Sequence, residues 1–112
     1  MLEKRSHIVF LKDFYGPLLT PKQQEAMSLH YENDWSLAEI AEHMQITRQA
    51  VHDILKRAEM ALQEYENRLG LAGRFLETRQ RLQEVCTLLE NPSEGDNIGE
   101  ALLILHKISD ML

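Results

Sequence analysis

A run from Thr47 to Leu69 constrains the fold most, because it contains neither glycine nor proline. Apolar residues recur along it at steps of three and four, a spacing that places them on one face of an α-helix. Thr47 can cap the start of this helix, and Gly70 is the kind of residue that ends one. A helix of this length, about 33 Å at ~1.5 Å per residue, must cover its apolar side with other helices or with a second chain. The apolar stripe consists of Val51, Ile54, Leu55, Ala58, Leu62, Tyr65 and Leu69.

The rest of the chain also has helical periodicity. Only three prolines and five glycines interrupt it, which favours helix over sheet. Breaks are expected at Gly16-Pro17, at residues 70–73 and at the loop 91–97. We therefore predict an all-α protein of five or six helices. Besides the long helix, these are expected at residues 4–15, 20–31, 36–43, 74–90 and 98–112.

Two segments carry the signature of a helix start. Thr20–Gln23 has a capping threonine, a proline at the first helical position and a glutamine that can reach back to the cap. Ser36–Glu39 repeats the capping-box pattern with serine and glutamate. Both patterns fix where a helix begins, and the second one begins a short helix just before the long one.

This short helix and the long helix after it form a helix-turn-helix pattern. Two helices that cross closely need a small residue at the contact, and Ala41 supplies it. The turn contains a position that often adopts the left-handed conformation, where glycine is favoured, and here it is Gln45. The expected cost is about 1 kcal/mol of backbone strain. The apolar side chains between the two helices are expected to be Ile40, Ile46, Val51 and Ile54.

We divide the chain into two parts on this basis. Residues 1–69 hold the N-terminal helix and the helix-turn-helix with its extended third helix. Residues 70–112 hold a C-terminal helical pair. Both parts are expected to belong to the same compact domain, in which the C-terminal helices either support the long helix or pair two chains.

The long helix presents an outward face suited to nucleic acid. In a helix-turn-helix, the first turns of the second helix enter the major groove. Arg48 can contact a phosphate or guanine, and Gln49 can pair with adenine. Asp53 would repel phosphate, so it either reads cytosine or pairs with Arg57 four residues later. The candidate nucleic-acid-binding residues are Thr47, Arg48, Gln49, His52, Lys56 and Arg57.

The charge is unevenly distributed. The formal net charge is −6, which argues against a surface covered in DNA-binding cations. Residues 1–24 and 47–57 are nevertheless net positive, whereas residues 25–46 and 58–112 are net negative. Two interpretations follow. The basic islands favour nucleic acid, and the acidic 25–46 segment favours a protein partner with a basic surface.

The sequence does not indicate an enzyme. It has no phosphate-binding loop and no glycine-rich cofactor fingerprint, so neither a catalytic residue nor a cofactor is predicted. Glu39 and His43 have a metal-compatible spacing without an evident third ligand, so we predict no metal site. The single cysteine, Cys86, is expected to be buried in a helix core. One unpaired thiol, with no apolar stretch long enough for a membrane span, predicts a soluble cytoplasmic protein.

Three stretches resemble the YlxM family of small bacterial helix-turn-helix proteins. They are Phe14–Gln24, which reads FYGPLLTPKQQ, Ser36–Ala41, which reads SLAEIA, and Thr47–Glu59, which reads TRQAVHDILKRAE. The resemblance covers residues 8–75. Residues 20–60 are more loosely similar to the region-four domain of bacterial sigma factors. This implies a helix-turn-helix fold of sigma region-four or winged-helix type without a wing.

The resemblance also carries functional expectations. It implies a nucleic-acid-binding accessory or regulatory protein linked to the signal recognition particle pathway, because the family's genes adjoin that of the particle's GTPase. The expected partners are DNA or RNA and components of the particle. A second copy of the chain is a further expected partner because of the apolar helices and not because of the resemblance. Such a homodimer would place two recognition helices about 34 Å apart. The alternative is a module that binds the GTPase or another protein without touching nucleic acid.

Overall fold

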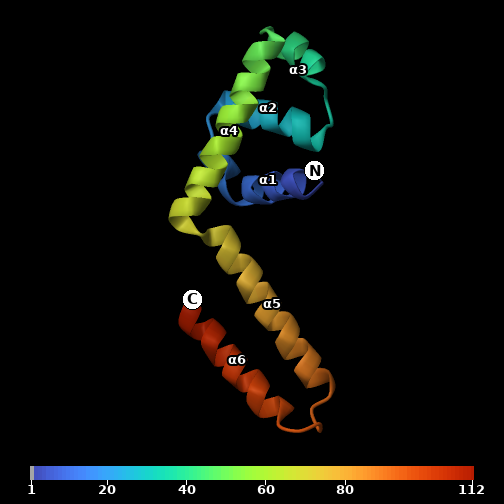
Figure 1. Ribbon diagram of the computed structural model, residues 1–112, viewed down its shortest axis with the longest axis vertical. Helices are drawn as coiled ribbons and strands as arrows, with labels where there is room; N and C mark the ends of the chain where they lie inside the picture. The colour runs from blue at the N-terminus through green and yellow to red at the C-terminus, as the bar shows by residue number, and fades with distance from the viewer. Residues whose placement is uncertain (1) are drawn as a thin grey trace. The chain divides into compact units, whose positions relative to one another are not determined.

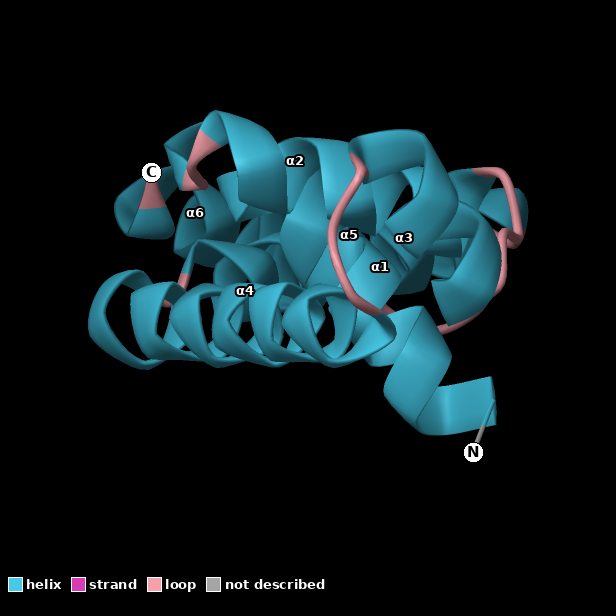
Figure 2. Cartoon of the chain, turned by 90° about the horizontal axis from the view of Figure 1, so that it is seen from above, coloured by secondary structure: helices cyan, strands magenta, loops and turns pink. Residues whose placement is uncertain are grey.

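The computed structural model describes residues 2–112, and every regular element in this range is a helix (Figure 2). The all-α prediction is confirmed. None of these helices is both long and apolar enough to cross a membrane. In chain order, the α-helices are α1 (Leu2–Tyr15), α2 (Pro21–Met27), α3 (Leu37–Met44), α4 (Arg48–Leu69), α5 (Leu71–Glu90) and α6 (Asn97–Met111), with a 3₁₀ turn at Gly16–Leu18 and a π turn at Ser28–Glu32.

Both predicted capping boxes are present. The Thr20 hydroxyl accepts a hydrogen bond from the Gln23 backbone N–H at 3.2 Å, and the Gln23 side chain accepts one from the Thr20 N–H at 3.1 Å. Ser36 and Glu39 make the same reciprocal pair at 3.2 and 3.1 Å. Each pair satisfies backbone donors that the first turn of a helix would otherwise leave without partners. The starts of α2 and α3 are therefore encoded locally.

The end of the second helix differs from a regular α-helix. After Met27 the chain continues as a π turn, closed by a 3.2 Å hydrogen bond from the Asn33 N–H to the Ser28 carbonyl. The Arg5 guanidinium of α1 donates to the carbonyls of His30 and Tyr31, each at 3.3 Å, and lies 4.9 Å from the Tyr31 ring centre. A cation from α1 thus supplies donors to carbonyls at the C-terminal end of the helix.

The chain forms two compact units, the first ending at Ala72 and the second comprising Gly73–Leu112. In the first unit, α4 is the central element, and α1, α2 and α3 all pack against it (Figure 1). These helices cover most of the long apolar stripe of α4, but Leu69 at its end is exposed. Whether the two parts form one compact domain, divided at residues 69 and 70, stays a prediction.

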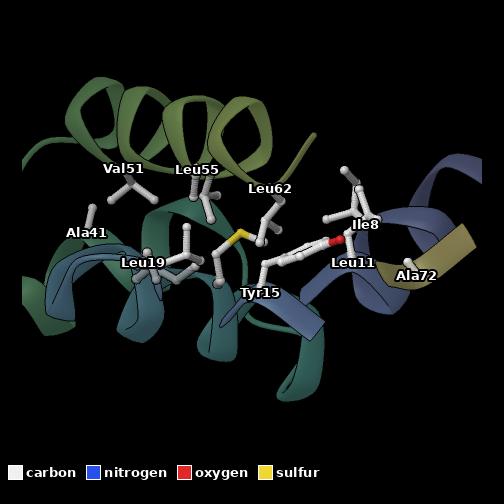
Figure 3. Close-up of a cluster of buried hydrophobic side chains, with 13 residues drawn as sticks. Ile8, Leu11, Tyr15, Leu19, Ala41, Val51, Leu55, Leu62 and Ala72 are labelled. Carbon is white, nitrogen blue, oxygen red and sulfur yellow. The ribbon is translucent and has the colours of Figure 1, made fainter. Parts of the chain in front are cut away.

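The core of the first unit gathers side chains from α1 to α4 and from the first turn of α5. Figure 3 shows the Tyr15 ring close to Leu62, with its hydroxyl pointing toward Leu11 and Ala72. Tyr15, Val51 and Leu62 are completely buried. The buried members are Ile8, Leu11, Tyr15, Leu19, Ala26, Met27, Ile40, Ala41, Val51, Leu55, Ala58, Leu62 and Ala72.

A buried hydrogen-bond network joins α1 to the junction of α4 and α5. The Tyr15 hydroxyl donates to Glu66 Oε1 at 2.5 Å and accepts from the Leu71 N–H at 3.0 Å, and the same Glu66 oxygen accepts from the Ala72 N–H at 3.0 Å. Burial, followed by the hydrogen bond to Glu66, raises the pKa of Tyr15 above its ordinary value. The predicted break over residues 70–73 is wrong in extent. Only Gly70, at φ 64°, leaves the helical path, because this network caps the next helix at once.

The second unit is a hairpin in which α6 runs back beside α5 (Figure 1). Its buried apolar residues are Val85, Ala101 and Ile108. Cys86 is exposed, so the expectation of a buried thiol is wrong. Val85 is buried as the helical spacing predicts. Cys86 is the next residue, so its side chain points about 100° away from that of Val85 around the helix axis.

Candidate nucleic-acid interface

Helices α3 and α4 form the predicted helix-turn-helix. Ile40 and Val51 are completely buried, and Ala41 is 7% exposed, as expected for the small residue at the helix crossing. Ile46 and Ile54 are partly buried against the same core. The wedge between the two helices is therefore filled by the predicted residues. This packing fixes the orientation of the first turns of α4 against α3.

The turn between the helices has the predicted backbone conformation. Gln45 adopts the left-handed conformation with φ 58° and ψ 46°. The N–H of the next residue, Ile46, donates to the Ala41 carbonyl at 3.0 Å, which closes the end of α3. A glutamine thus occupies the position where glycine would be free of strain.

Thr47 is the N-cap of α4. Its hydroxyl oxygen accepts a hydrogen bond from the Ala50 N–H at 3.0 Å, and its backbone is extended at φ −77° and ψ 159°. The side chain is exposed, as is that of Arg48. Backbone N–H groups and the helix dipole both favour an anion at this end of a long helix.

All six predicted contact residues are exposed, but they do not form one cluster. Gln49, His52 and Lys56 follow one another at steps of three and four, so they share one face of α4. Thr47 and Arg48 lie at the helix start, and Arg57 lies on the other edge of the outward surface. The face is therefore narrow and extends over the first three turns.

Asp53 lies within this face and has different partners from those predicted. Its Oδ1 accepts a hydrogen bond from Gln49 Nε2 at 3.0 Å and lies 3.6 Å from His52 Nδ1. Of the two predicted alternatives, the pairing with Arg57 is wrong, because the carboxylate turns back toward the helix start instead. One consequence is that Asp53 holds the Gln49 amide in place. The second amide N–H and the carbonyl oxygen of Gln49 remain available for a base edge.

The cations divide into two groups. Arg5 pairs with Asp34 at 3.3 Å, and Lys12 forms an ion pair with Glu32. The Lys12 ammonium, together with a hydrogen bond from the Ser28 hydroxyl, lowers the pKa of Glu32. Much of the basic N-terminal island therefore serves to hold α1 against the end of the second helix. The ion pairs found within residues 2–112 do not include Arg48, Lys56 or Arg57.

One basic residue near this face was not among the predicted contacts. Lys4 of α1 and Lys56 of α4 line the same shallow surface depression, together with Glu59 and Met60. The two lysines are far apart in the sequence, so no local pattern could have joined them. The packing of α1 across α4 brings them together.

The acidic 25–46 segment is largely engaged within the fold. Beyond the ion pairs of Glu32 and Asp34, Glu25 lies 3.4 Å from His43 Nε2, and Glu39 caps Ser36. His43 also contacts the Trp35 ring edge-on at 5.3 Å between ring centres. The described residues contain no group of three side chains arranged to hold a metal ion.

Comparison with known proteins gives the family. The family model described as "Putative helix-turn-helix protein, YlxM / p13 like" matches residues 2–101. The chain belongs to this family. Among the relatives, all named UPF0122 proteins, one from Exiguobacterium sp. is 50% identical over 107 residues, covering 96% of this chain and 97% of the relative. One from Bacillus thuringiensis is 48% identical (91% and 90% covered), and one from Desulforamulus reducens is 49% identical (80% and 76% covered).

Family membership confirms the resemblance and the helix-turn-helix. The YlxM match also reaches well into the second unit, beyond residue 75 where the resemblance seen in the sequence ended. The helical hairpin is therefore largely part of what defines the family.

Proposed function

We propose that this YlxM-family protein is a nucleic-acid-binding accessory or regulatory protein of the bacterial cytoplasm that acts through α4. The observation that carries the proposal is the start of α4. A capped helix N-terminus is exposed there beside Arg48, Gln49 and Lys56, and the two cations, Arg48 and Lys56, take part in none of the ion pairs found within residues 2–112. This is the chemistry that phosphates and base edges require.

Each residue has a distinct role in the proposal. Thr47 and the first N–H groups of α4 bind a phosphate, and Lys56 and Arg57 contribute charge to the backbone. Arg48 binds phosphate or the acceptor edge of guanine, and Gln49, held by Asp53, pairs with adenine. His52 lies between them on the same face. Lys4 adds a further phosphate contact next to Lys56.

We further propose that this binding serves the signal recognition particle pathway. This part rests on the family resemblance, which makes the particle's RNA the first ligand to test against duplex DNA. The alternative, a module that binds the particle's GTPase without nucleic acid, is less well supported. Its motivation was the acidic 25–46 segment, and four of the five carboxylates there already have partners inside the fold.

The test is a salt titration of binding. Labelled duplex DNA and structured RNA are titrated with the protein, and affinity is measured by fluorescence anisotropy at several salt concentrations. Replacing Arg48 or Lys56 with Ala should weaken binding about tenfold and reduce the salt slope by about one for each phosphate that the variant no longer neutralises. Arg68→Ala is the matched control, because Arg68 lies on the same helix, near its other end, paired with Glu64 at 2.8 Å.

Two results would contradict the proposal. The first is a double variant, Arg48→Ala with Lys56→Ala, that binds both nucleic acids as tightly as Arg68→Ala does. The second is capture of the particle's GTPase that persists unchanged after nuclease treatment while the protein binds no nucleic acid. That second result would support the protein-interaction alternative instead.

A further inference from the structure

The hairpin of the second unit has far more exposed than buried apolar surface. Val85, Ala101 and Ile108 are its buried apolar residues, and a two-helix hairpin with so small a core falls well short of independent stability. Among the exposed large apolar residues, five that recur along the two helices are between 37% and 53% exposed. They are Leu82 and Leu89 of α5 and Ile98, Leu102 and Leu105 of α6, and we call them the hairpin stripe. Leu76 and Leu103 are exposed as well, at other positions around the same two helices.

The hairpin stripe is regular in both helices. In α5, Leu82 precedes the buried Val85 by three residues, and Leu89 follows it by four. Leu82 and Leu89 are seven residues apart, and this spacing is the repeat by which helices pack along a seam. A stripe with this repeat has the periodicity of a helix–helix contact rather than that of scattered surface residues.

The stripe of α6 repeats the same arrangement. Ile98 precedes the buried Ala101 by three residues, and Leu105 follows it by four. In both helices the stripe therefore lies beside the buried residues, displaced in the same direction around the helix axis. Because α5 and α6 run antiparallel, equal rotations bring both stripes to the same face of the hairpin. The hairpin stripe is therefore one continuous apolar face.

The other face of the hairpin is charged. A charged residue comes directly before each of the three buried residues. These charged residues are Glu84, Glu100 and Lys107. Glu77 and Arg81 form a 2.8 Å ion pair four residues apart in α5. The charged side of the hairpin therefore suits contact with water, and the side that carries the hairpin stripe does not.

We propose that the hairpin stripe is a homodimer interface, on which a second copy of the chain packs its own hairpin to form a four-helix bundle. The available area agrees with this. At roughly 200 Å² for a fully exposed large apolar residue, the five exposures leave on the order of 450 Å² of apolar surface per chain. A standard stable interface buries about 800 Å² per partner, about 65% of it apolar in homodimers.

A second copy fits this face better than the chain's own first unit. The exposed large apolar residues described there are few and lie on separate elements: Leu18 on the 3₁₀ turn, Met60 and Leu69 at different points of α4, and Leu71 at the start of α5. They form no stripe of matching length. The hairpin stripe, in contrast, is complementary to itself, because a two-fold axis sets two identical stripes against one another.

The test is sedimentation velocity of the full chain between about 1 and 100 μM. The wild type should sediment as a species with twice the chain mass of 13.0 kDa. The double variant Leu82→Glu with Leu102→Glu should sediment as a 13.0 kDa monomer, and its helical circular dichroism should equal that of the wild type. Gln80→Glu is the matched control, since it adds a carboxylate on the charged side of α5 and should leave the dimer intact. If the double variant loses helix content, Leu102→Gln alone should raise the dimer Kd at least about tenfold.

Cys86 provides an independent readout. It follows Val85 directly and borders the hairpin stripe, so dimerisation should slow its alkylation in a concentration-dependent way. A wild type that stays monomeric at the highest concentration would overturn the proposal, and slow alkylation of such a monomer would assign the face to intramolecular packing. A folded double variant that still dimerises would overturn it as well. None of these measurements depends on nucleic-acid binding, so the dimer and the proposed function fail or succeed separately.

Discussion

At the residue scale, the most consequential side chain is Tyr15. It is fully buried, yet its hydroxyl joins the Glu66 carboxylate to the first N–H group of α5. A buried polar group of this kind is costly when one partner is removed, since the others lose their hydrogen bonds without regaining water. Tyr15 thus combines a core position with a role in connecting helices.

We expect Tyr15→Phe to lower the free energy of unfolding at pH 7 by about 1–3 kcal/mol. The raised pKa of Tyr15 also gives the effect a pH dependence. A folded-state pKa above the unfolded value contributes stability that is complete below about pH 10 and is lost as pH rises through the folded pKa. Denaturant unfolding between neutral and alkaline pH should therefore show a gap between wild type and variant that narrows above about pH 10.

Tyr65→Phe is the control for this measurement, because that hydroxyl makes only a 3.5 Å contact with the Leu18 carbonyl. It should cost much less at neutral pH. Equal destabilisation by the two substitutions would show that the network around Glu66 does not contribute as described.

At the scale of elements, three helix starts are encoded locally. The caps predicted from short patterns are present at Thr20, Ser36 and Thr47. Two other features depend on residues from other helices and could not be predicted from a short pattern. The π turn depends on Arg5 of α1, and the start of α5 directly after Gly70 depends on Tyr15 and Glu66.

The cap of α4 gives a prediction for this scale. Thr47→Ala removes the acceptor for the Ala50 N–H and should destabilise the first unit by about 1 kcal/mol, measured by thermal or denaturant unfolding. Thr87→Ala in α5 is the control, since that hydroxyl donates to the Gln83 carbonyl within the helix and caps nothing. A Thr47→Ala protein as stable as the control would mean that the cap adds nothing to folding.

The same contrast applies to the candidate interface. Its exposed positions on α4 could be predicted because they follow from helical spacing within one segment. The Gln49–Asp53 contact is compatible with that spacing, but the two alternatives predicted for Asp53 were a cytosine contact and a pair with Arg57. Lys4 could not be predicted locally, because only the packing of α1 on α4 brings it near Lys56.

At the scale of the whole molecule, the two units differ in how much core they contain. The first unit has thirteen buried apolar residues packed around α4, and Ala72 is the last of them in the sequence. The second has the three buried residues and the exposed hairpin stripe. The overall helical class was predictable from periodicity, but this inequality was not, because sequence patterns do not distinguish a buried stripe from an exposed one.

We therefore expect a fragment of residues 1–72 to fold alone. It should show helical circular dichroism and a cooperative thermal transition, because its core is complete without the hairpin. A fragment of residues 73–112 should be largely unfolded when dilute and gain helix as its concentration rises. A fragment 1–72 without a cooperative transition would show that the first unit needs the hairpin in order to fold.

The π turn at Ser28–Glu32 has a consequence for how the chain tolerates changes in length. A π turn holds one residue more than an α-helix needs over the same path, so it amounts to a single-residue insertion accommodated inside a helix. Deleting one residue there would let the helix close normally, but it would rotate everything after it by about 100°. The carbonyls that Arg5 binds would turn away, and the helix-turn-helix would begin out of phase with α1. The one extra residue in the π turn therefore sets the rotation of α3 and α4 relative to α1.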